Sequence, residues 1–279
     1  GNFNRNWPDL SAGLAERVCD KLTGDGARNV AIVREALLAD LNERTAGNEM
    51  TSLRLALARL AVDADFVFDM HCDSDSLLHL FLSTAHWPEG ADLSAEIGSH
   101  ATLLCEDSGG HSFDETFSLP WVKLAAACPG RPIPPACLAA TIEYRGQADV
   151  FDAMAEPDAQ ALFRFLQRRG LIAGNPGPAP KPLCDGTLLD ATDSVRSPGA
   201  GVLAYKVELG QRVTAGTDIA ELVDPMADDP AKARMPIKTI TDGLVLSRRL
   251  DKLVRPGDSV AKVVGNRSLP SRKGYLLED

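Results

Sequence analysis

Along the first 170 residues, apolar side chains recur every three or four positions, the spacing of amphipathic helices. This spacing predicts helices over 10–22, 29–44, 91–104 and 156–170, and one more that Thr51 and Ser52 can cap. Between them, runs of β-branched and aromatic residues predict strands over 65–71, 78–84 and 138–144. Strands that alternate with helices predict an α/β fold with a buried sheet.

The last third of the chain has short apolar runs and frequent glycines. Residues 199–223 and 241–264 form a weak repeat, in which a glycine turn leads into a final apolar strand. Such a pair of copies resembles the barrel-sandwich of biotinyl and lipoyl carrier domains. Lys232 lies between the copies but lacks the sequence context of a carrier lysine, so we expect a cap or an oligomer contact. The Pro/Gly-rich segment 174–187 is typical of a linker and predicts two domains, 1–190 and 191–279.

The net charge and the cysteine pattern limit the classes of partner and the compartment that we expect. The 279 residues carry a net charge of −10, which argues against nucleic acid and anionic membranes as partners. The longest apolar runs, such as 77–82, are too short to cross a bilayer. The six cysteines lack CxxC spacing, which excludes a cysteine-based zinc knuckle and indicates reduced thiols in a cytoplasmic protein. Formation of a homo-oligomer stays open as an alternative.

Three short polar segments are candidates for one pocket. They are Asn4-Arg5 near the start, Asp69-x-His71 at the end of one predicted strand, and Glu143 at the end of another. In open α/β sheets, binding sites form where strands end at their carboxyl edges. We therefore expect these side chains to converge.

His71 has two interpretations. A single histidine at a strand end is commonly a structural group. Asp69, however, lies on the same side of the strand and can hold one ring nitrogen, as metal-bound histidines require. A neutral imidazole held in this way is a good zinc ligand. His86 and Glu89 have H-x-x-E spacing, but Pro88 disfavours the helical turn that would bring them together.

Glu143 also has two interpretations. A carboxylate in an apolar strand needs a partner, and Arg145 is two residues away on the same face. Alternatively, Glu143 is a general acid/base beside a metal-activated water, and Arg145 contacts the substrate. Arg5 offers a planar fork for a carboxylate, to which Asn4 can add a donor.

Weaker candidates surround these residues. Asp73 and Asp75 are either solvated turn acids or contacts to a substrate amine. His111 lies in a glycine-containing segment, 108–117, that we expect to be a loop able to gate a pocket. Strand alternation points Cys72 away from the His71 face.

Together these segments resemble a known family. NFNRNWP is similar to the NxNRxFP motif of the succinylglutamate desuccinylase/aspartoacylase family, DMHCD to its D-x-H zinc strand, and TIEYRGQADV to its T-x-E catalytic strand. The resemblance implies a zinc-carboxypeptidase-like mixed sheet flanked by helices, followed by a β-rich C-terminal domain. It implies hydrolysis of a small N-acyl amino acid, with His71 as a zinc ligand and Glu143 as general base and acid. It also implies Asn4 and Arg5 as contacts to the substrate carboxylate.

The family supplies its first two zinc ligands from an H-x-x-E segment upstream of NxNR, and this sequence begins at NxNR. We therefore expect one Zn²⁺ per chain, with two further ligands upstream of Gly1. Two alternatives stay open. One is a metallocarboxypeptidase that acts on peptides. The other is a non-catalytic binding or scaffold protein, which requires that the metal site be incomplete.

Overall fold

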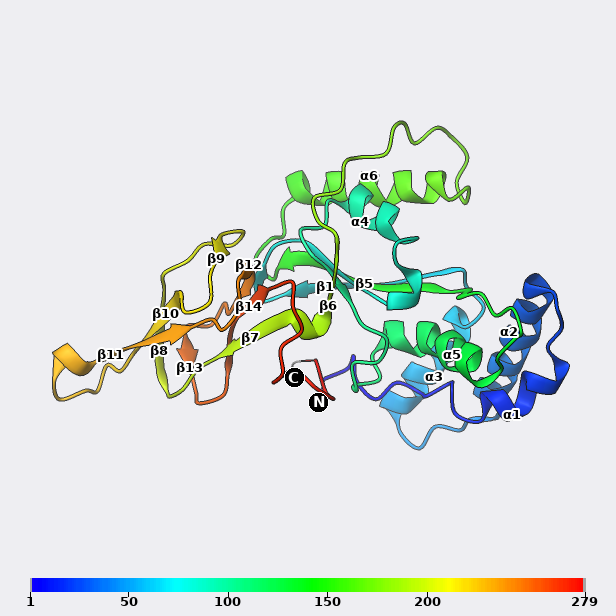
Figure 1. The fold of residues 1–279 in the computed structure, drawn as a ribbon, viewed down its shortest axis with the longest axis horizontal. Helices are drawn as coiled ribbons and strands as arrows, with labels where there is room; N and C mark the ends of the chain where they lie inside the picture. Colours follow the sequence, from blue (N-terminus) through cyan, green and yellow to red (C-terminus); the bar gives the residue numbers. More distant parts are fainter. Residues whose placement is uncertain (1, 278–279) are drawn as a thin grey trace.

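The computed structural model describes residues 2–277, which form a helix-covered mixed sheet joined to a β-rich part (Figure 1). The α-helices are α1 (Leu14–Val18), α2 (Gly26–Glu43), α3 (Glu49–Ala61), α4 (Ala91–Ile97), α5 (Phe113–Ala127) and α6 (Asp152–Arg168). The strands before the β-rich part are β1 (Phe66–Asp73), β2 (Asp75–Ser76), β3 (His79–Leu82), β4 (Thr102–Leu104), β5 (Leu138–Gly146) and β6 (Gly186–Leu188). Within residues 2–277, no helix combines the length and hydropathy needed to cross a bilayer.

The sheet of the helical part has the strand order β1-β5-β3-β4-β6. β1 and β5 are parallel, β3 runs antiparallel to β5, and β4 and β6 continue parallel to β3. Helices α4 and α6 cover one face, while α5, with α1, α2 and α3 behind it, covers the other (Figure 1). The expected mixed sheet flanked by helices is confirmed.

Alternation along β1 and β5 decides which side chains meet which layer. Val67 and Ala139 pack into the core around α5, whereas Phe68 and Ile142 pack beneath α4 and α6. The odd-numbered side chains of both strands therefore point to the α5 face. Beyond the helices, the carboxyl ends of these strands continue toward the β-rich part on that face (Figure 1).

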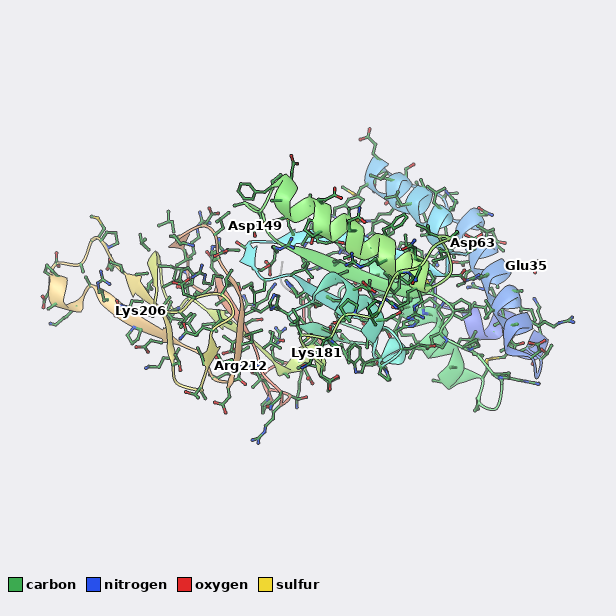
Figure 2. All side chains as sticks on the ribbon, turned by 90° about the horizontal axis from the view of Figure 1, so that it is seen from above. Glu35, Asp63, Asp149, Lys181, Lys206 and Arg212 are labelled. Atoms are coloured by element: carbon green, nitrogen blue, oxygen red, sulfur yellow. A yellow bond between two sulfur atoms is a disulfide. The ribbon has the colours of Figure 1, made fainter. Side chains whose placement is uncertain are left out.

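The β-rich part contains two antiparallel sheets. One has the order β11-β10-β8-β13, and the other has the order β2-β12-β14-β7 with β9 paired to β12. Its strands are β7 (Thr192–Arg196), β8 (Gly201–Tyr205), β9 (Arg212–Val213), β10 (Asp218–Val223), β11 (Arg234–Lys238), β12 (Gly243–Arg248), β13 (Leu253–Val254) and β14 (Ser259–Val264). The two repeat copies supply β8 and β10, and β12 and β14. Lys206 and Arg212 lie in this part, whereas Glu35 and Asp63 lie at the helical end (Figure 2).

The two parts are joined directly after β1. Strand β2 pairs with β12, so a segment of the helical part completes a sheet of the β-rich part. Two ion pairs cross the same boundary, Asp73–Lys262 at 2.8 Å and Asp75–Arg248 at 3.0 Å. The β-rich part is therefore fixed beside the strand that carries His71.

Several predicted elements differ from the observed ones. The predicted helix 91–104 ends at Gly98, whose φ of 68° is left-handed, and the rest forms β4. Helix α3 begins earlier than expected and is capped by Asn48, whose side chain accepts from the Thr51 amide. The predicted helix 10–22 is reduced to α1 and a 3₁₀ turn.

The segment 108–117, which we expected to be a loop, contains the start of α5. Nearly every residue from Asp114 to Trp121 is buried, so this helix has no polar face to produce a helical period. Pro120 inside the helix weakens the sequence signal further.

The expectation that all cysteines are reduced is wrong for one pair. Cys19 and Cys128 form a disulfide that joins the end of α1 to the end of α5 across 109 residues of sequence. The cysteine pattern therefore gives no support to a reducing compartment. Cys72, Cys105, Cys137 and Cys184 are free thiols.

Removing this disulfide is expected to destabilise the protein measurably. Closure of a loop of this length restricts the unfolded chain, so Cys128→Ser should lower the free energy of unfolding by about 2–5 kcal/mol in oxidising buffer. Urea denaturation measures the difference. Adding reductant should remove it, and Cys72→Ser should have no effect. Equal stabilities of wild type and Cys128→Ser under oxidising conditions would show that the bond does not form.

Candidate active site

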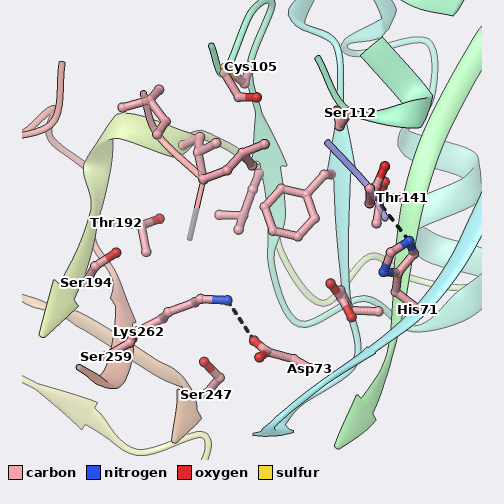
Figure 3. Close-up of a pocket in the computed structure, with 18 of the residues that line it drawn as sticks. His71, Asp73, Cys105, Ser112, Thr141, Thr192, Ser194, Ser247, Ser259 and Lys262 are labelled. Atoms are coloured by element: carbon pink, nitrogen blue, oxygen red, sulfur yellow. Dashed lines mark hydrogen bonds and ion pairs between the residues drawn. The ribbon is translucent and has the colours of Figure 1, made fainter. Parts of the chain in front are cut away.

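Three polar side chains lie side by side on neighbouring strands of the sheet. In the register of the sheet, His71 of β1 is opposite Glu143 of β5, which is opposite His79 of β3. All three have odd numbers in their strands and point to the α5 face. His71 and Glu143 line a cavity of about 450 Å³ that lies between the sheet and the β-rich part (Figure 3). The convergence expected at the strand ends is present.

His71 is held by a carboxylate two residues away. Its Nε2 lies 2.8 Å from Oδ2 of Asp69, and this hydrogen bond raises the pKa of His71. When Nε2 carries the proton that Asp69 accepts, the lone pair of the neutral ring is on Nδ1. The ring is therefore oriented as a metal-bound or proton-accepting imidazole requires.

Asn4 orients this pair. Its Nδ2 donates to Oδ2 of Asp69 at 3.0 Å and lies 3.3 Å from Nε2 of His71. Its Oδ1 accepts from the backbone N–H of Phe113 at the start of α5 at 2.7 Å. Both ends of the amide are thus occupied by the protein, and Asn4 positions the Asp69–His71 pair against α5.

Glu143 is a buried carboxyl group with an unsatisfied oxygen. Its Oε2 has no hydrogen-bond partner among residues 2–277. Burial, together with the nearby negative charge of Asp73, raises the pKa of Glu143 to about 7, although Lys262 and His71 act in the opposite direction. The group is therefore poised to gain or lose a proton near neutrality, as a general acid/base requires.

Arg5 lies at the cavity beside the C-terminal segment. Its Nε donates to the Tyr275 hydroxyl at 2.9 Å and its Nη1 to the Asn4 carbonyl at 2.7 Å. Arg272 and Leu276 from the same segment also line the cavity. Tyr275 carries no motif that marks it in the sequence.

Arg145 does not line the cavity. Its guanidinium forms a bidentate ion pair with Asp158 of α6, at 2.7 and 2.8 Å, so the alternative pairing with Glu143 is absent. This placement separates Arg145 from Asn4, Arg5 and His71, and we leave it out of the substrate contacts proposed below.

The weaker candidates are dispersed. Asp73 lines the cavity and Asp75 joins the two parts of the molecule. His111 lies outside the main cavity, and His86 is buried in a 3₁₀ turn, where its Nε2 has no partner within residues 2–277. Lys232 is exposed, and its Nζ lies 3.6 Å from Oδ2 of Asp229.

Sequence reasoning missed the contribution of the β-rich part and of α5. Lys262 of β14 enters the cavity wall, and Asp114 and Glu115 of α5 line it. A charged residue inside the apolar run of β14 was the available signal for Lys262. No sequence signal marked Asp114 and Glu115, because the helix that contains them was not recognised.

The burial of Glu115 leads to a pH-dependent prediction. Burial, reinforced by Asp114, raises the pKa of Glu115 to about 7 from 4.5, and its Oε1 accepts from the Ser108 amide. A carboxyl group with a raised folded-state pKa loses stabilisation as pH rises from its unfolded to its folded pKa. Glu115→Gln should therefore gain roughly 3 kcal/mol relative to wild type between pH 4.5 and 7. Urea denaturation at several pH values checks this, and a constant difference would contradict it.

The residues present fit part of a zinc site. Nδ1 of His71 has no hydrogen-bond partner within residues 2–277, and Asp69 holds the other ring nitrogen, which is the arrangement of an imidazole ligand. The same residues contain no group of three or more His, Cys, Asp or Glu side chains that could hold a metal ion. A catalytic zinc needs three protein ligands, and among residues 2–277 His71 is the candidate for one of them.

Solved structures with the same architecture exist. A protein assigned to the succinylglutamate desuccinylase/aspartoacylase family from Shewanella frigidimarina superimposes with a TM-score of 0.82 at 24% identity, over 95% of this chain and 72% of the other. This chain has that family's fold. A family protein from Shewanella amazonensis gives a TM-score of 0.80 at 24% identity, over 94% and 72%. One from Rhodobacter sphaeroides gives 0.60 at 16% identity, over 82% and 67%.

No protein-family model and no curated protein matches the chain. The resemblance carried by the short motifs is confirmed at the level of the fold, through the solved structures. The motif strands expected to carry the zinc ligand and the catalytic glutamate are β1 and β5, and they are adjacent and parallel in this fold.

Proposed function

We propose that this chain belongs to a zinc-dependent hydrolase that cleaves the amide bond of a small N-acyl amino acid. The observation that carries the proposal is the pair His71 and Glu143. An imidazole oriented by Asp69 lies beside a buried carboxyl group with an unsatisfied oxygen, at the wall of one cavity. The shared fold with succinylglutamate desuccinylase/aspartoacylase proteins supports the same reaction class.

The metal would be held by Nδ1 of His71 together with two ligands that we propose lie upstream of Gly1, in an H-x-x-E segment. When bound, zinc supplies a Lewis acid that polarises the amide carbonyl and lowers the pKa of a bound water. Asp69 keeps the lone pair of His71 on Nδ1, and Asn4 keeps Asp69 in place.

Glu143 transfers the proton from the attacking water to the departing amine. Its carboxylate accepts a proton from the attacking water and delivers it to the nitrogen of the departing amine, which leaves as a free amino acid. Burial keeps the affinity of Glu143 for this proton high enough for both steps. Arg5 offers its planar guanidinium to the substrate carboxylate, with Tyr275 fixing the Nε edge of the fork.

The size and the walls of the cavity favour small substrates over peptides. The β-rich part and the C-terminal segment supply much of the cavity wall, including Lys262 and Leu276. A metallocarboxypeptidase needs an open groove for the rest of its peptide, whereas this cavity has a volume of about 450 Å³ and the β-rich part forms one of its walls (Figure 3).

The test is hydrolysis by the full-length, zinc-loaded protein. A panel of N-acetyl and N-succinyl amino acids should release free amine, detected with a fluorogenic amine reagent, while C-terminally blocked peptides should not. Chelation should abolish turnover and added zinc should restore it. Turnover of peptides alone would support the carboxypeptidase, and zinc-free protein without any turnover would support the binding or scaffold role.

A further inference from the structure

A polar row on the β-rich part faces the catalytic side chains. In the sheet β7-β14-β12, Ser194 is the register partner of Lys262, which is in turn the partner of Ser247. Partners in adjacent strands point to the same face about 5 Å apart. All three line the cavity, opposite His71 (Figure 3). The row thus presents an ammonium group with one hydroxyl on each side of it.

Two hydroxyls in this wall lack partners. Oγ1 of Thr192 and Oγ of Ser194 are buried and form no hydrogen bond within residues 2–277. Thr192 is 1% exposed, yet it lines the cavity. A buried hydroxyl without a partner costs about 1–3 kcal/mol, so native proteins rarely keep one without a use. Two of them on a cavity wall indicate a ligand group that completes their hydrogen bonds.

The charge of the wall indicates which group. Lys262 brings a positive charge next to these hydroxyls and is held in position by Asp73 at 2.8 Å. Hydroxyl and ammonium donors that converge on one place suit an oxygen-rich anion, above all a carboxylate. Glu143 lines the same cavity as this wall and is the register partner of His71. Arg5 also lines this cavity, so a substrate with its amide at Glu143 and one end at Arg5 can extend its other end to the row.

We propose that Thr192, Ser194, Ser247 and Lys262 form a second subsite that determines specificity by binding a carboxylate at the far end of the acyl chain. This proposal rests on the proposed function, which assigns the carboxylate of the amino acid to Arg5. The β-rich part thus selects the acyl group, and the helical part carries out the hydrolysis.

Binding of the acyl product separates this proposal from the reaction itself. Titration calorimetry of the full-length, zinc-loaded protein should show tighter binding of succinate than of butyrate, whose single carboxylate takes the place of the one released by hydrolysis and which has a methyl group in place of the other. Ser194→Ala should weaken succinate binding about 10-fold, the effect of one hydrogen bond to a charged group, and leave butyrate binding unchanged. Ser268→Ala is the matched control, because this exposed serine bonds to Asp190 outside the cavity.

Thr192→Val tests the same subsite without depending on a folding defect. The isosteric change removes an unsatisfied hydroxyl, so the ligand-free protein should melt at the same temperature or higher while succinate binding falls. A purely structural threonine would give a lower melting temperature and unchanged binding.

The outcomes are distinct. Equal affinities for succinate and butyrate, no binding of either, or equal effects of Ser194→Ala on both would overturn the subsite. If succinate preference is present but no amide is hydrolysed, the proposed function fails and the subsite stands. If amides are hydrolysed without any succinate preference, only the subsite fails.

Discussion

Glu143→Ala is expected to retain zinc and lose nearly all hydrolysis. The reason is that Glu143 is the carboxyl group at the cavity wall with an unsatisfied oxygen next to His71. Removal of a general acid/base typically lowers the rate by about 10²–10⁴-fold. Because Glu143 serves both the attacking water and the departing amine, we expect the loss in kcat to lie at the upper end of this range. Steady-state kinetics of the full-length protein, with zinc content measured on the same sample, check the prediction.

A matched control excludes a general loss of charge or stability. Glu156→Ala removes an exposed carboxylate from the outer face of α6 and should leave kcat and zinc content unchanged. Glu143→Gln keeps the size of the side chain but cannot accept the proton, so it should be as inactive as Glu143→Ala. Turnover of either Glu143 variant at the wild-type rate would remove Glu143 from the mechanism.

The sequence predicted the strands of the candidate site well because the polar residues that mark them are close together in sequence. Asp69 and His71 are two residues apart, so strand alternation alone places them on one side, and the structure gives the bond between them. Glu143 was identified as a carboxyl group in an apolar strand, which is costly unless it has a use. What alternation could not supply was the register that sets His71 directly opposite Glu143.

The parts that sequence reasoning missed depend on contacts between distant segments. The burial of every residue from Asp114 to Trp121 removed the helical period from the first half of α5, so Glu115 was left in a predicted loop. Lys262 is 189 residues from Asp73, and only the packing of the β-rich part shows that they meet. Arg145 was expected either to pair with Glu143 or to contact the substrate, but it pairs with Asp158 of α6.

His71→Ala is expected to abolish zinc binding as well as hydrolysis. The proposed zinc site uses Nδ1 of His71, and a catalytic zinc with only two protein ligands left is bound far more weakly. Metal analysis of the purified full-length variant should find little zinc, whereas the wild type should contain one equivalent. Asp69→Asn should give an intermediate result, with zinc affinity about 10–100-fold lower, because the imidazole stays but loses the carboxylate that orients it.

His100→Ala serves as the control for loss of a histidine, since His100 is exposed and does not line the cavity. The gradation among the three variants distinguishes a ligand from a structural residue. A structural histidine would lower the melting temperature and leave one zinc per chain after the protein is refolded. Full zinc occupancy in His71→Ala would therefore refute the ligand assignment.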